Sequence, residues 1–326
     1  MTPVEFAMHT DFLCCPYEDH GTLKAGDPQK LVCQACRREF PSVEGRPILF
    51  DETRCVFSTL EVLQHEDRRQ FPEVKGFKFR LRQLLPVAAN FDSTDYLKEA
   101  LPHLPPVPVV LVIGCGLTGA LLRQLLPAAS LILSDVTLQG DAEFACSGEC
   151  LPFRDQSFDL IVADQVLEHV VNPTSVVNEI HRCLKSGGIV FSGIPFYYPN
   201  HGLPYDFQRV TPLGHKMLYR QFRQLALHTT GGPFSCLSLA LLNFFCSLWE
   251  DLWWRRLTSL LTRLLFGPFL WLDRFYRGRE IGSTTICLNS VFMGVKAGVA
   301  QSPKAILGSF CSGESEAGMP TASPTT

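Results

Sequence analysis

The sequence has no large excess of either charge and no apolar run long enough to cross a bilayer as a helix. Its 29 basic and 32 acidic residues leave a formal net charge of -3, so the chain as a whole is not a polycationic nucleic-acid binder. Its most apolar segments, 234–249 and 257–272, fall short of the ~20 residues that a spanning helix needs. With 46% hydrophobic and 19% charged residues, the chain of 326 residues is expected to be globular.

An apolar N-terminal signal segment is also absent, and the 13 cysteines are odd in number. Several of them, including Cys115, Cys183 and Cys246, stand in apolar runs that are typical of a core. We therefore expect reduced thiols and a cytoplasmic protein rather than a secreted one.

The central stretch, residues 107–230, alternates apolar strands with amphipathic helices. The pattern predicts strands at 109–113, 130–134, 159–163 and 189–194, and helices at 117–126 and 173–184. Strands and helices joined by short connections form a doubly wound, mostly parallel sheet, with ligands at the carboxyl ends of the strands. The fold class is therefore predicted to be α/β.

A glycine-rich loop, Gly114-Cys115-Gly116-Leu117-Thr118-Gly119, follows the first predicted strand. Glycine allows a sharp turn and a close approach of the backbone to a ligand. Asp135, at the end of the next strand, can accept hydrogen bonds from both hydroxyls of a ribose. These residues alone leave a nicotinamide dinucleotide and S-adenosylmethionine (SAM) equally open.

Three further segments separate these two cofactors: 151–162 (LPFRDQSFDLIV), 166–170 (VLEHV) and 182–188 (RCLKSGG). Together with the glycine loop, they make residues 107–198 resemble a class I SAM-dependent methyltransferase. The resemblance implies a seven-stranded Rossmann-like sheet, with two antiparallel last strands at 225–230 and 284–296. It also implies that SAM is the methyl donor and is held by Gly114, Cys115, Gly116, Asp135, Ser147, Leu151, Asp164 and Gln165.

Ser147 is a departure from the family, which usually has an aspartate there to contact the adenine amino group. A hydroxyl can still accept a hydrogen bond but brings no charge, so Asp141 or Glu149 is an alternative contact. The resemblance gives the segment of Glu168 and His169 mainly a pocket-shaping role, beside a smaller prospect of acid–base catalysis.

Residues 195–212 (PFYYPNHGLPYDFQRVTP) are expected at the carboxyl edge of the sheet, where an acceptor would bind. They resemble a segment of bacterial-type methyltransferases linked to surface polysaccharides or glycolipids. We expect His201 or Asp206 to accept a proton and Arg209 to anchor an anionic group. An Asp206–Arg209 pair that only braces the loop is the alternative.

No Asn/Asp-Pro-Pro-Tyr motif follows the fourth strand, which argues against amino groups of bases and glutamine as acceptors. The expected acceptor is a hydroxyl of a small molecule, a glycan or a lipid-linked compound. A catalytically silent methyltransferase fold that serves as a binding protein, and an RNA or protein methyltransferase, are the alternatives; a nicotinamide oxidoreductase rests only on the three glycines.

The N-terminal residues resemble a short zinc ribbon. An intact ribbon has two Cys-x-x-Cys pairs for tetrahedral coordination, but the first is broken here because Glu18 stands in place of its second cysteine. The predicted zinc ligands are Cys15, His20, Cys33 and Cys36, with Cys14 as an alternative to His20. A ribbon that has lost its metal is the competing interpretation.

The predicted organisation ends in an apolar insert and a polar tail. The expected parts are the ribbon-like module 1–52, a helical lid or linker 53–106, the SAM-binding core 107–232, an apolar helical insert 233–282, the last core strand 283–300 and a disordered tail 301–326. The insert joins neighbouring antiparallel strands, so it must leave and return on one side as a helical hairpin. Its tryptophans and arginines favour peripheral contact with a membrane through residues 233–280; burial against the sheet or in a homodimer is the alternative.

Overall fold

The structure, a computed structural model, describes residues 12–17, 20–27, 30–64, 96–116, 118–275 and 286–312. The chain forms two compact units. The first consists of Met1–Phe71, Leu97–Ile194 and Asn200–Gln208, and the second of Pro72–Tyr96, Pro195–Pro199 and Arg209–Thr326.

The first unit is built on five parallel strands in the order β7-β6-β5-β8-β9. Their bounds are β5 Val109–Ile113, β6 Ser130–Asp135, β7 Phe144–Cys146, β8 Phe158–Asp164 and β9 Leu184–Pro195. The chain starts in the centre at β5, adds β6 and β7 on one side, and then crosses to add β8 and β9 on the other. This reversal of strand order creates a topological switch point, where α/β sheets bind ligands.

The predicted α/β class and the parallel sheet are confirmed. Val110–Ile113 in β5 are at most 4% exposed, as expected of a continuous apolar run covered on both faces. The crossover helices are α5, Thr118–Leu125, and α6, Pro173–Cys183. Asn172 caps α6 by accepting a hydrogen bond from the Ser175 amide, and proline at the first position suits a helix start.

Strand β9 differs from its prediction because it begins at Leu184, directly after α6, rather than at residue 189. Its register against β8 shifts between the pairs Phe158–Leu184 and Leu160–Ile189. Residues 186–188, which lie between the predicted helix and the predicted strand, are therefore an irregular stretch inside β9, with Gly187 at φ 76°.

The N-terminal residues form an antiparallel series of strands: β1 Leu23–Asp27, β2 Lys30–Cys33, β3 Glu39–Val43 and β4 Arg46–Leu49. Strand β4 then pairs in parallel with β7, opposing Ile48 to Ala145 and Leu49 to Cys146. The ribbon-like module predicted at 1–52 therefore continues the central sheet. Of the predicted linker 53–106, the described parts include the short helix α2, Thr59–Leu63, and the 3-10 helix η1, Lys98–His103.

The second unit contains the two predicted antiparallel strands, β10 Phe222–Thr230 and β11 Asn289–Lys296. Helix α7, Pro212–Leu218, precedes β10, and helix α11, Pro303–Ser312, follows β11. The tail expected from residue 301 therefore starts with a helix instead of disorder, and its remainder, 313–326, lies outside the described residues.

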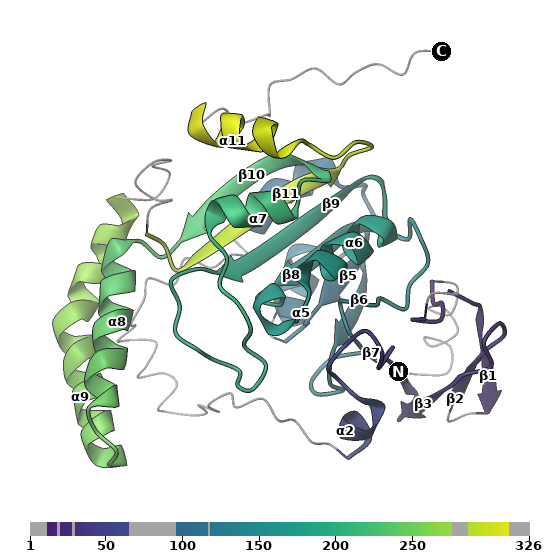
Figure 1. Cartoon of the computed structure of the whole chain (residues 1–326), viewed down its shortest axis with the longest axis horizontal. Helices are drawn as coiled ribbons and strands as arrows, with labels where there is room; N and C mark the ends of the chain where they lie inside the picture. Colours follow the sequence, from purple (N-terminus) through teal and green to yellow (C-terminus); the bar gives the residue numbers. More distant parts are fainter. Residues whose placement is uncertain are drawn as a thin grey trace. The chain divides into compact units, whose positions relative to one another are not determined.

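The predicted apolar insert is a helical hairpin of α8, Pro233–Ser247, and α9, Leu252–Phe266 (Figure 1). The 3-10 helix η3, Gly267–Phe275, packs against both. The buried Asp273 carboxylate in η3 accepts hydrogen bonds from the Phe234 and Ser235 amides, at 2.9 Å each. A carboxylate on these amides satisfies the first turn of α8 and fixes η3 to its start.

Arg182, in the last turn of α6, holds the 151–155 segment against that helix. Its guanidinium donates to the carbonyls of Leu151 and Phe153 at 3.0 and 2.6 Å, and to Glu179 Oε2 at 2.8 Å. Burial opposes its charge, but the hydrogen bond and the attraction of Glu179 raise the pKa of Arg182 above its usual value. The first half of the predicted LPF segment is therefore fixed by one cation.

We expect Arg182→Gln to lower the free energy of unfolding by about 3 kcal/mol, because it leaves two carbonyls without their donor and the buried Glu179 carboxylate without its cation. Urea denaturation measures this difference. Arg123→Gln is the matched control, since Arg123 is 52% exposed and 4.0 Å from Glu143, and should change stability by less than about 0.5 kcal/mol. Equal losses of stability from the two substitutions would contradict the stabilising role of Arg182.

Candidate functional site

The predicted cofactor residues lie at the carboxyl ends of four neighbouring parallel strands. The glycine loop follows β5, Asp135 ends β6, Ser147 follows β7, and Asp164 ends β8. Since parallel strands present their carboxyl ends at the same edge of the sheet, the fold brings these residues to one edge, at the switch point.

The glycine loop has a backbone that other residues would strain. Gly114 and Gly116 have φ values of 66° and 35°, in the left-handed region that favours glycine. A Cβ on Gly114 would lie 2.7 Å from Val166 Cγ2. Residue 114 must therefore tolerate a left-handed backbone and lack a side chain, and glycine meets both requirements.

Asp135 and Cys115, at this edge of the sheet, differ in burial and in charge. Asp135 is half-buried and accepts a hydrogen bond from the Thr137 amide at 3.3 Å. Burial, and next the charge of Asp135, raise the pKa of Cys115 to about 12. Cys115 is therefore a neutral thiol at neutral pH and contributes shape and backbone, while Asp135 contributes the charge.

Asp164 and Gln165 form a tight turn after β8. Gln165 has φ 57° and donates its amide to the Gly193 carbonyl at 2.9 Å. Asp164 Oδ1 occupies the space that a Cβ on Gly193 would take, so this carboxylate can lie against β9 only because residue 193 is glycine. A non-glycine residue in the left-handed region at the end of a central strand stores strain, which is common at functional sites.

Ser147 and Leu151 are both fully buried. Ser147 Oγ accepts a hydrogen bond from the Glu149 amide at 3.2 Å, and the Leu151 amide donates to Glu179 Oε2 at 2.9 Å. Glu149, considered above as a substitute contact for adenine, uses Oε1 to accept the Asn172 amide at 2.9 Å. Burial raises the pKa of Glu149, and Asp141 is exposed.

A second cluster lies between the 3-10 helix η2, Leu167–His169, and the loop 200–208. Glu168 has no solvent exposure, and neither oxygen of its carboxylate has a hydrogen-bond partner. Nε2 of His201 lies 3.6 Å from Glu168 Oε1, and Nε2 of His169 lies 3.8 Å from it. The predicted catalytic His201 is thus brought onto the Glu168–His169 pair.

Asp206 shapes the loop that carries His201. Its Oδ2 accepts the His201 amide at 2.8 Å and lies 3.8 Å from Nδ1 of the same imidazole. The Gln208 side-chain amide ties the loop to η2 by donating to the Leu167 and Val170 carbonyls at 2.8 and 3.2 Å. Asp206 therefore orients His201 rather than facing Glu168 itself.

Arg209 belongs to the second unit. Its guanidinium donates to the carbonyls of Tyr198 and Pro199, at 2.9 Å each, and so braces the segment that follows β9. The predicted role of Arg209 as an anchor for an anionic acceptor stays a prediction.

The approach of Glu168 and His169 to His201 is the feature that the sequence analysis missed. Both residues were assigned mainly to pocket shape because their motif lies next to the strand that carries cofactor residues. The loop 200–208 lies against η2 and so brings His201 to Glu168 and His169. The sequence feature that could have indicated this approach is the presence of three potential metal ligands in two segments that each follow a central strand.

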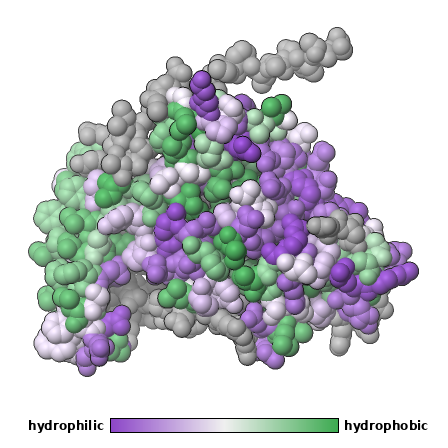
Figure 2. Space-filling model, in the orientation of Figure 1, coloured by the Kyte–Doolittle hydropathy of each residue, from purple (hydrophilic) through white to green (hydrophobic). Residues whose placement is uncertain are grey.

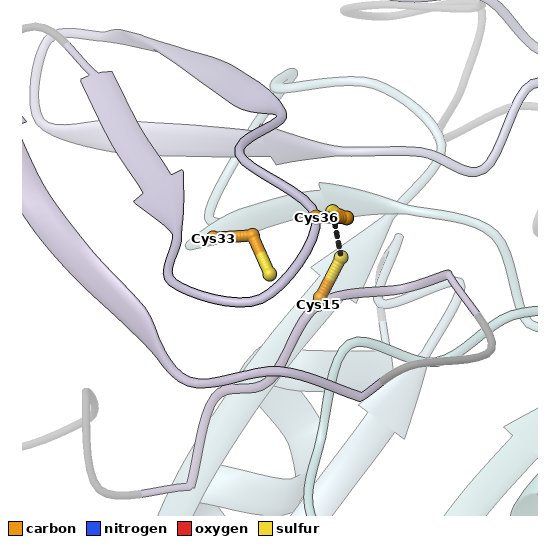
Figure 3. A group of neighbouring side chains, drawn as sticks. All are labelled: Cys15, Cys33 and Cys36. Atoms are coloured by element: carbon orange, nitrogen blue, oxygen red, sulfur yellow. Dashed lines mark hydrogen bonds between the residues drawn. The ribbon is translucent and has the colours of Figure 1, made fainter.

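Three of the four predicted zinc ligands form a cluster in the N-terminal strands (Figure 3). Ligand atoms of Cys15, Cys33 and Cys36 all lie within 4.8 Å of one another, and the sulfurs of Cys15 and Cys36 are 3.7 Å apart. Tetrahedral zinc with Zn–S bonds of about 2.3 Å places two sulfurs roughly 3.8 Å apart. The fourth predicted ligand, His20, is outside this group, and its Nδ1 lies 3.7 Å from the sulfur of Cys14.

Residues 111–192 match the family model described as "Methyltransferase domain". The match covers the glycine loop, Asp135, Ser147 and the β8 turn, which the structure places at one edge. The central part of this chain is therefore similar to a methyltransferase domain over residues 111–192.

Among curated proteins, a stretch of 47 residues is 45% identical to an uncharacterized protein of Methanocaldococcus jannaschii. It covers 14% of this chain and 23% of that protein, so this chain spans less than a quarter of the length of that relative.

Similar solved structures include a chain from the complex of the Haloferax volcanii Trm112 methyltransferase activator with a methyltransferase (18% identity, 63% of this chain, 90% of that chain, TM-score 0.38). They also include a SAM-dependent methyltransferase of Methanosarcina mazei, with 14% identity over 61% of this chain and 97% of that chain and a TM-score of 0.37. A third is coclaurine N-methyltransferase, with 11% identity over 70% of this chain and 76% of that chain and a TM-score of 0.38. Because all three TM-scores are below 0.5, they say nothing about the function of this chain.

Proposed function

We propose that this protein is a SAM-dependent methyltransferase that acts on a hydroxyl of a small-molecule, glycan-linked or lipid-linked acceptor. The observation that carries the proposal is the meeting of the glycine loop, Asp135, Ser147 and Asp164 at one edge of the methyltransferase-like sheet.

The residues at this edge fit a nucleoside with an amino-acid end. Gly116 has room where a side chain would stand, which would let a ligand approach the backbone, and Asp135 offers a carboxylate to the ribose hydroxyls. The buried Ser147 would face the adenine as a neutral acceptor. SAM, when bound, supplies a methyl group already activated on a sulfonium.

The cluster of Glu168, His169, His201 and Asp206 supports a hydroxyl acceptor. A hydroxyl must lose its proton in order to take a methyl group, so its methylation benefits from a proton acceptor. His201, oriented by Asp206 and 25% exposed, is the side chain that an acceptor could reach. Replacing it should therefore harm turnover more than SAM binding.

Two substitutions separate SAM binding from turnover. We expect Asp135→Ala to weaken SAM binding at least about tenfold, because a charged hydrogen bond is worth ~1.5–3 kcal/mol. We expect His201→Ala and Asp206→Asn to keep SAM affinity and to lose turnover. Calorimetry with SAM and a transfer assay with labelled methyl against glycan, lipid, RNA and protein fractions measure the two effects.

Glu99→Ala, an exposed acidic residue of η1, is the matched control and should bind SAM normally. Absence of SAM binding near ~1 mM would favour the alternative, a silent methyltransferase fold that only binds a partner. Unchanged turnover in both the His201 and the Asp206 variants would reject the role of these residues in proton removal. Labelling confined to the RNA or protein fractions would reject a small-molecule, glycan-linked or lipid-linked acceptor.

We also propose that Cys15, Cys33 and Cys36 hold a structural Zn²⁺, with His20 or a water molecule as fourth ligand. The separation of the sulfurs suits tetrahedral coordination. A Cβ on Gly21 would lie 2.6 Å from the Cys33 sulfur, so the backbone at Gly21 leaves space for that thiol and no more.

Cobalt substitution tests the thiol site, because Co²⁺ bound by thiolates absorbs strongly in the near ultraviolet. We expect this thiolate absorption in the protein and its loss in Cys33→Ser and Cys36→Ser. Cys246→Ser, which removes a thiol of the α8–α9 hairpin, should keep it. Less than about half an equivalent of thiolate-bound metal in the unaltered protein would reject the site.

The α8–α9 hairpin supports peripheral contact with a membrane. Figure 2 shows hydrophobic side chains gathered over these helices. Between residues 233 and 275, in the hairpin and the adjoining η3, the large apolar side chains with more than a third of their surface exposed are Leu237, Phe244, Phe245, Leu248, Trp249, Leu252, Trp253, Trp254, Leu260, Leu261, Leu264, Leu265, Phe269, Trp271 and Phe275.

This surface fits the interface of an anionic bilayer. Arg255 and Arg256 are exposed beside Trp253 and Trp254, and aromatic and cationic side chains together suit headgroup depth. Among the described residues, no helix has the length and apolarity needed to cross a membrane. We therefore propose that the hairpin lies on an anionic membrane surface.

Vesicle flotation tests this contact. We expect the protein to float with vesicles that contain phosphatidylserine, and Trp253→Ser combined with Leu265→Ser to lower the bound fraction about tenfold or more, since each buried side chain contributes ~2 kcal/mol. Val299→Ser, which changes an 84% exposed apolar residue outside the hairpin, should float normally. An unaltered protein that stays soluble, or a dimer in sedimentation that the double variant abolishes, contradicts the proposal.

A further inference from the structure

Three potential ligand atoms converge between η2 and the loop 200–208. One ligand atom from each of Glu168, His169 and His201 lies within 4.8 Å of the other two. Both imidazoles turn Nε2 toward Glu168 Oε1, at 3.8 and 3.6 Å, and their rings meet edge to face with centroids 4.9 Å apart.

The hydrogen bonds around the two imidazoles decide which nitrogens carry protons. Nδ1 of His169 bonds the Tyr205 carbonyl, and a carbonyl only accepts, so this Nδ1 carries the proton. Nδ1 of His201 lies 3.8 Å from the Asp206 carboxylate, which favours a proton on the same nitrogen. In neutral imidazoles, both Nε2 lone pairs then point toward a carboxylate oxygen.

Neutral imidazoles would leave the negative charge of Glu168 without compensation from the two histidines. The Glu168 side chain has no exposure, and neither carboxylate oxygen has a hydrogen-bond partner. An isolated buried carboxylate costs several kcal/mol, unless a positive charge or hydrogen-bond donors neutralise it. When the imidazoles are neutral, a cation between the two lone pairs and the carboxylate oxygen would neutralise Glu168.

We infer that Glu168, His169 and His201 form a binding site for a divalent transition-metal ion. Two imidazole nitrogens and one carboxylate oxygen are a donor set that suits Zn²⁺ and its first-row neighbours better than Mg²⁺ or Ca²⁺. Bonds of about 2.1 Å to a tetrahedral ion place donors roughly 3.4 Å apart, so each imidazole nitrogen needs to approach Glu168 Oε1 by only a few tenths of an ångström.

The surroundings of the ligands match those of metal-binding histidines. Such histidines usually give their other ring N–H to a carbonyl or a carboxylate, which fixes the ring and its tautomer. His169 has the Tyr205 carbonyl in that position and His201 has Asp206. Asp206 is thereby a positioning residue for a metal ligand, and three protein ligands leave a coordination position open.

The role of the ion rests on the proposed function, whereas its binding does not. A divalent cation lowers the pKa of an oxygen ligand, so it would promote loss of the proton from an acceptor hydroxyl. With the ion bound, His201 would act as a metal ligand and not as the proton acceptor itself, so His201→Ala should lose turnover in either case.

Direct measurement of bound metal tests the site without any methyl-transfer assay. The full chain carrying Cys33→Ser, which disables the thiol cluster, is stripped with a chelator and dialysed against Co²⁺ or Zn²⁺. We expect about one equivalent of bound metal, a Co²⁺ spectrum without thiolate absorption, and a higher Tm when the ion is present.

Adding Glu168→Gln or His201→Ala to this background should lower metal affinity at least about tenfold and abolish the rise in Tm. Glu168→Gln keeps the volume of the side chain and removes its charge, so the metal-free variant should be no less stable than its parent. His201→Ala alters a partly exposed residue and covers the case in which the Glu168 variant fails to fold. His103→Ala, an exposed histidine of η1, is the matched control and should bind metal normally.

Less than about half an equivalent of metal in the Cys33→Ser background, or equal binding after Glu168→Gln and His201→Ala, overturns the inference. The first result would mean that protonated imidazoles neutralise Glu168 instead. Calorimetry with SAM on the same metal-free protein reports on the proposed function separately. Metal binding without SAM binding would therefore reject the methyltransferase proposal and leave the metal site standing.

Discussion

The parallel pairing of β5 with β6 and β8 is the constraint on which the first unit depends. A strand buried on both faces, as Val110–Ile113 are, can have parallel neighbours only if the chain returns through crossovers outside the sheet. Every crossover delivers the next strand in the same direction, so each one adds another carboxyl end to the same edge. The glycine loop, Asp135, Ser147 and Asp164 lie at one edge of the sheet because of this repeated return.

The central elements could be predicted from the sequence because their signals are local. The strand 109–113 was predicted with the bounds that the structure shows, and the helix 173–184 differs by one residue. A continuous apolar run that ends at glycine is enough to predict this strand. An asparagine and a proline before an amphipathic stretch are enough to predict the start of this helix. The resemblance to methyltransferases then supplied the cofactor and the candidate residues.

Other features depend on pairs that no local pattern records. Strand β4 joins the sheet because Ile48 and Leu49 find partners at Ala145 and Cys146, far along the chain. The approach of His201 to Glu168 likewise depends on a loop held by the Gln208 amide. The helix 303–312 was missed because its composition, rich in small and polar residues, is also that of a disordered tail.

The pairing of β4 with β7 has a consequence for the solution behaviour of the first unit. Strand β7 has only three residues, and without β4 it would end the sheet with unsatisfied backbone groups. Exposed strand borders of this kind recruit strands from other molecules and start aggregation. The N-terminal strands shift the border to β1, a short strand with an irregular register and a lysine at position 24. The N-terminal strands therefore also disfavour β-pairing between molecules, and this effect does not depend on a bound metal ion.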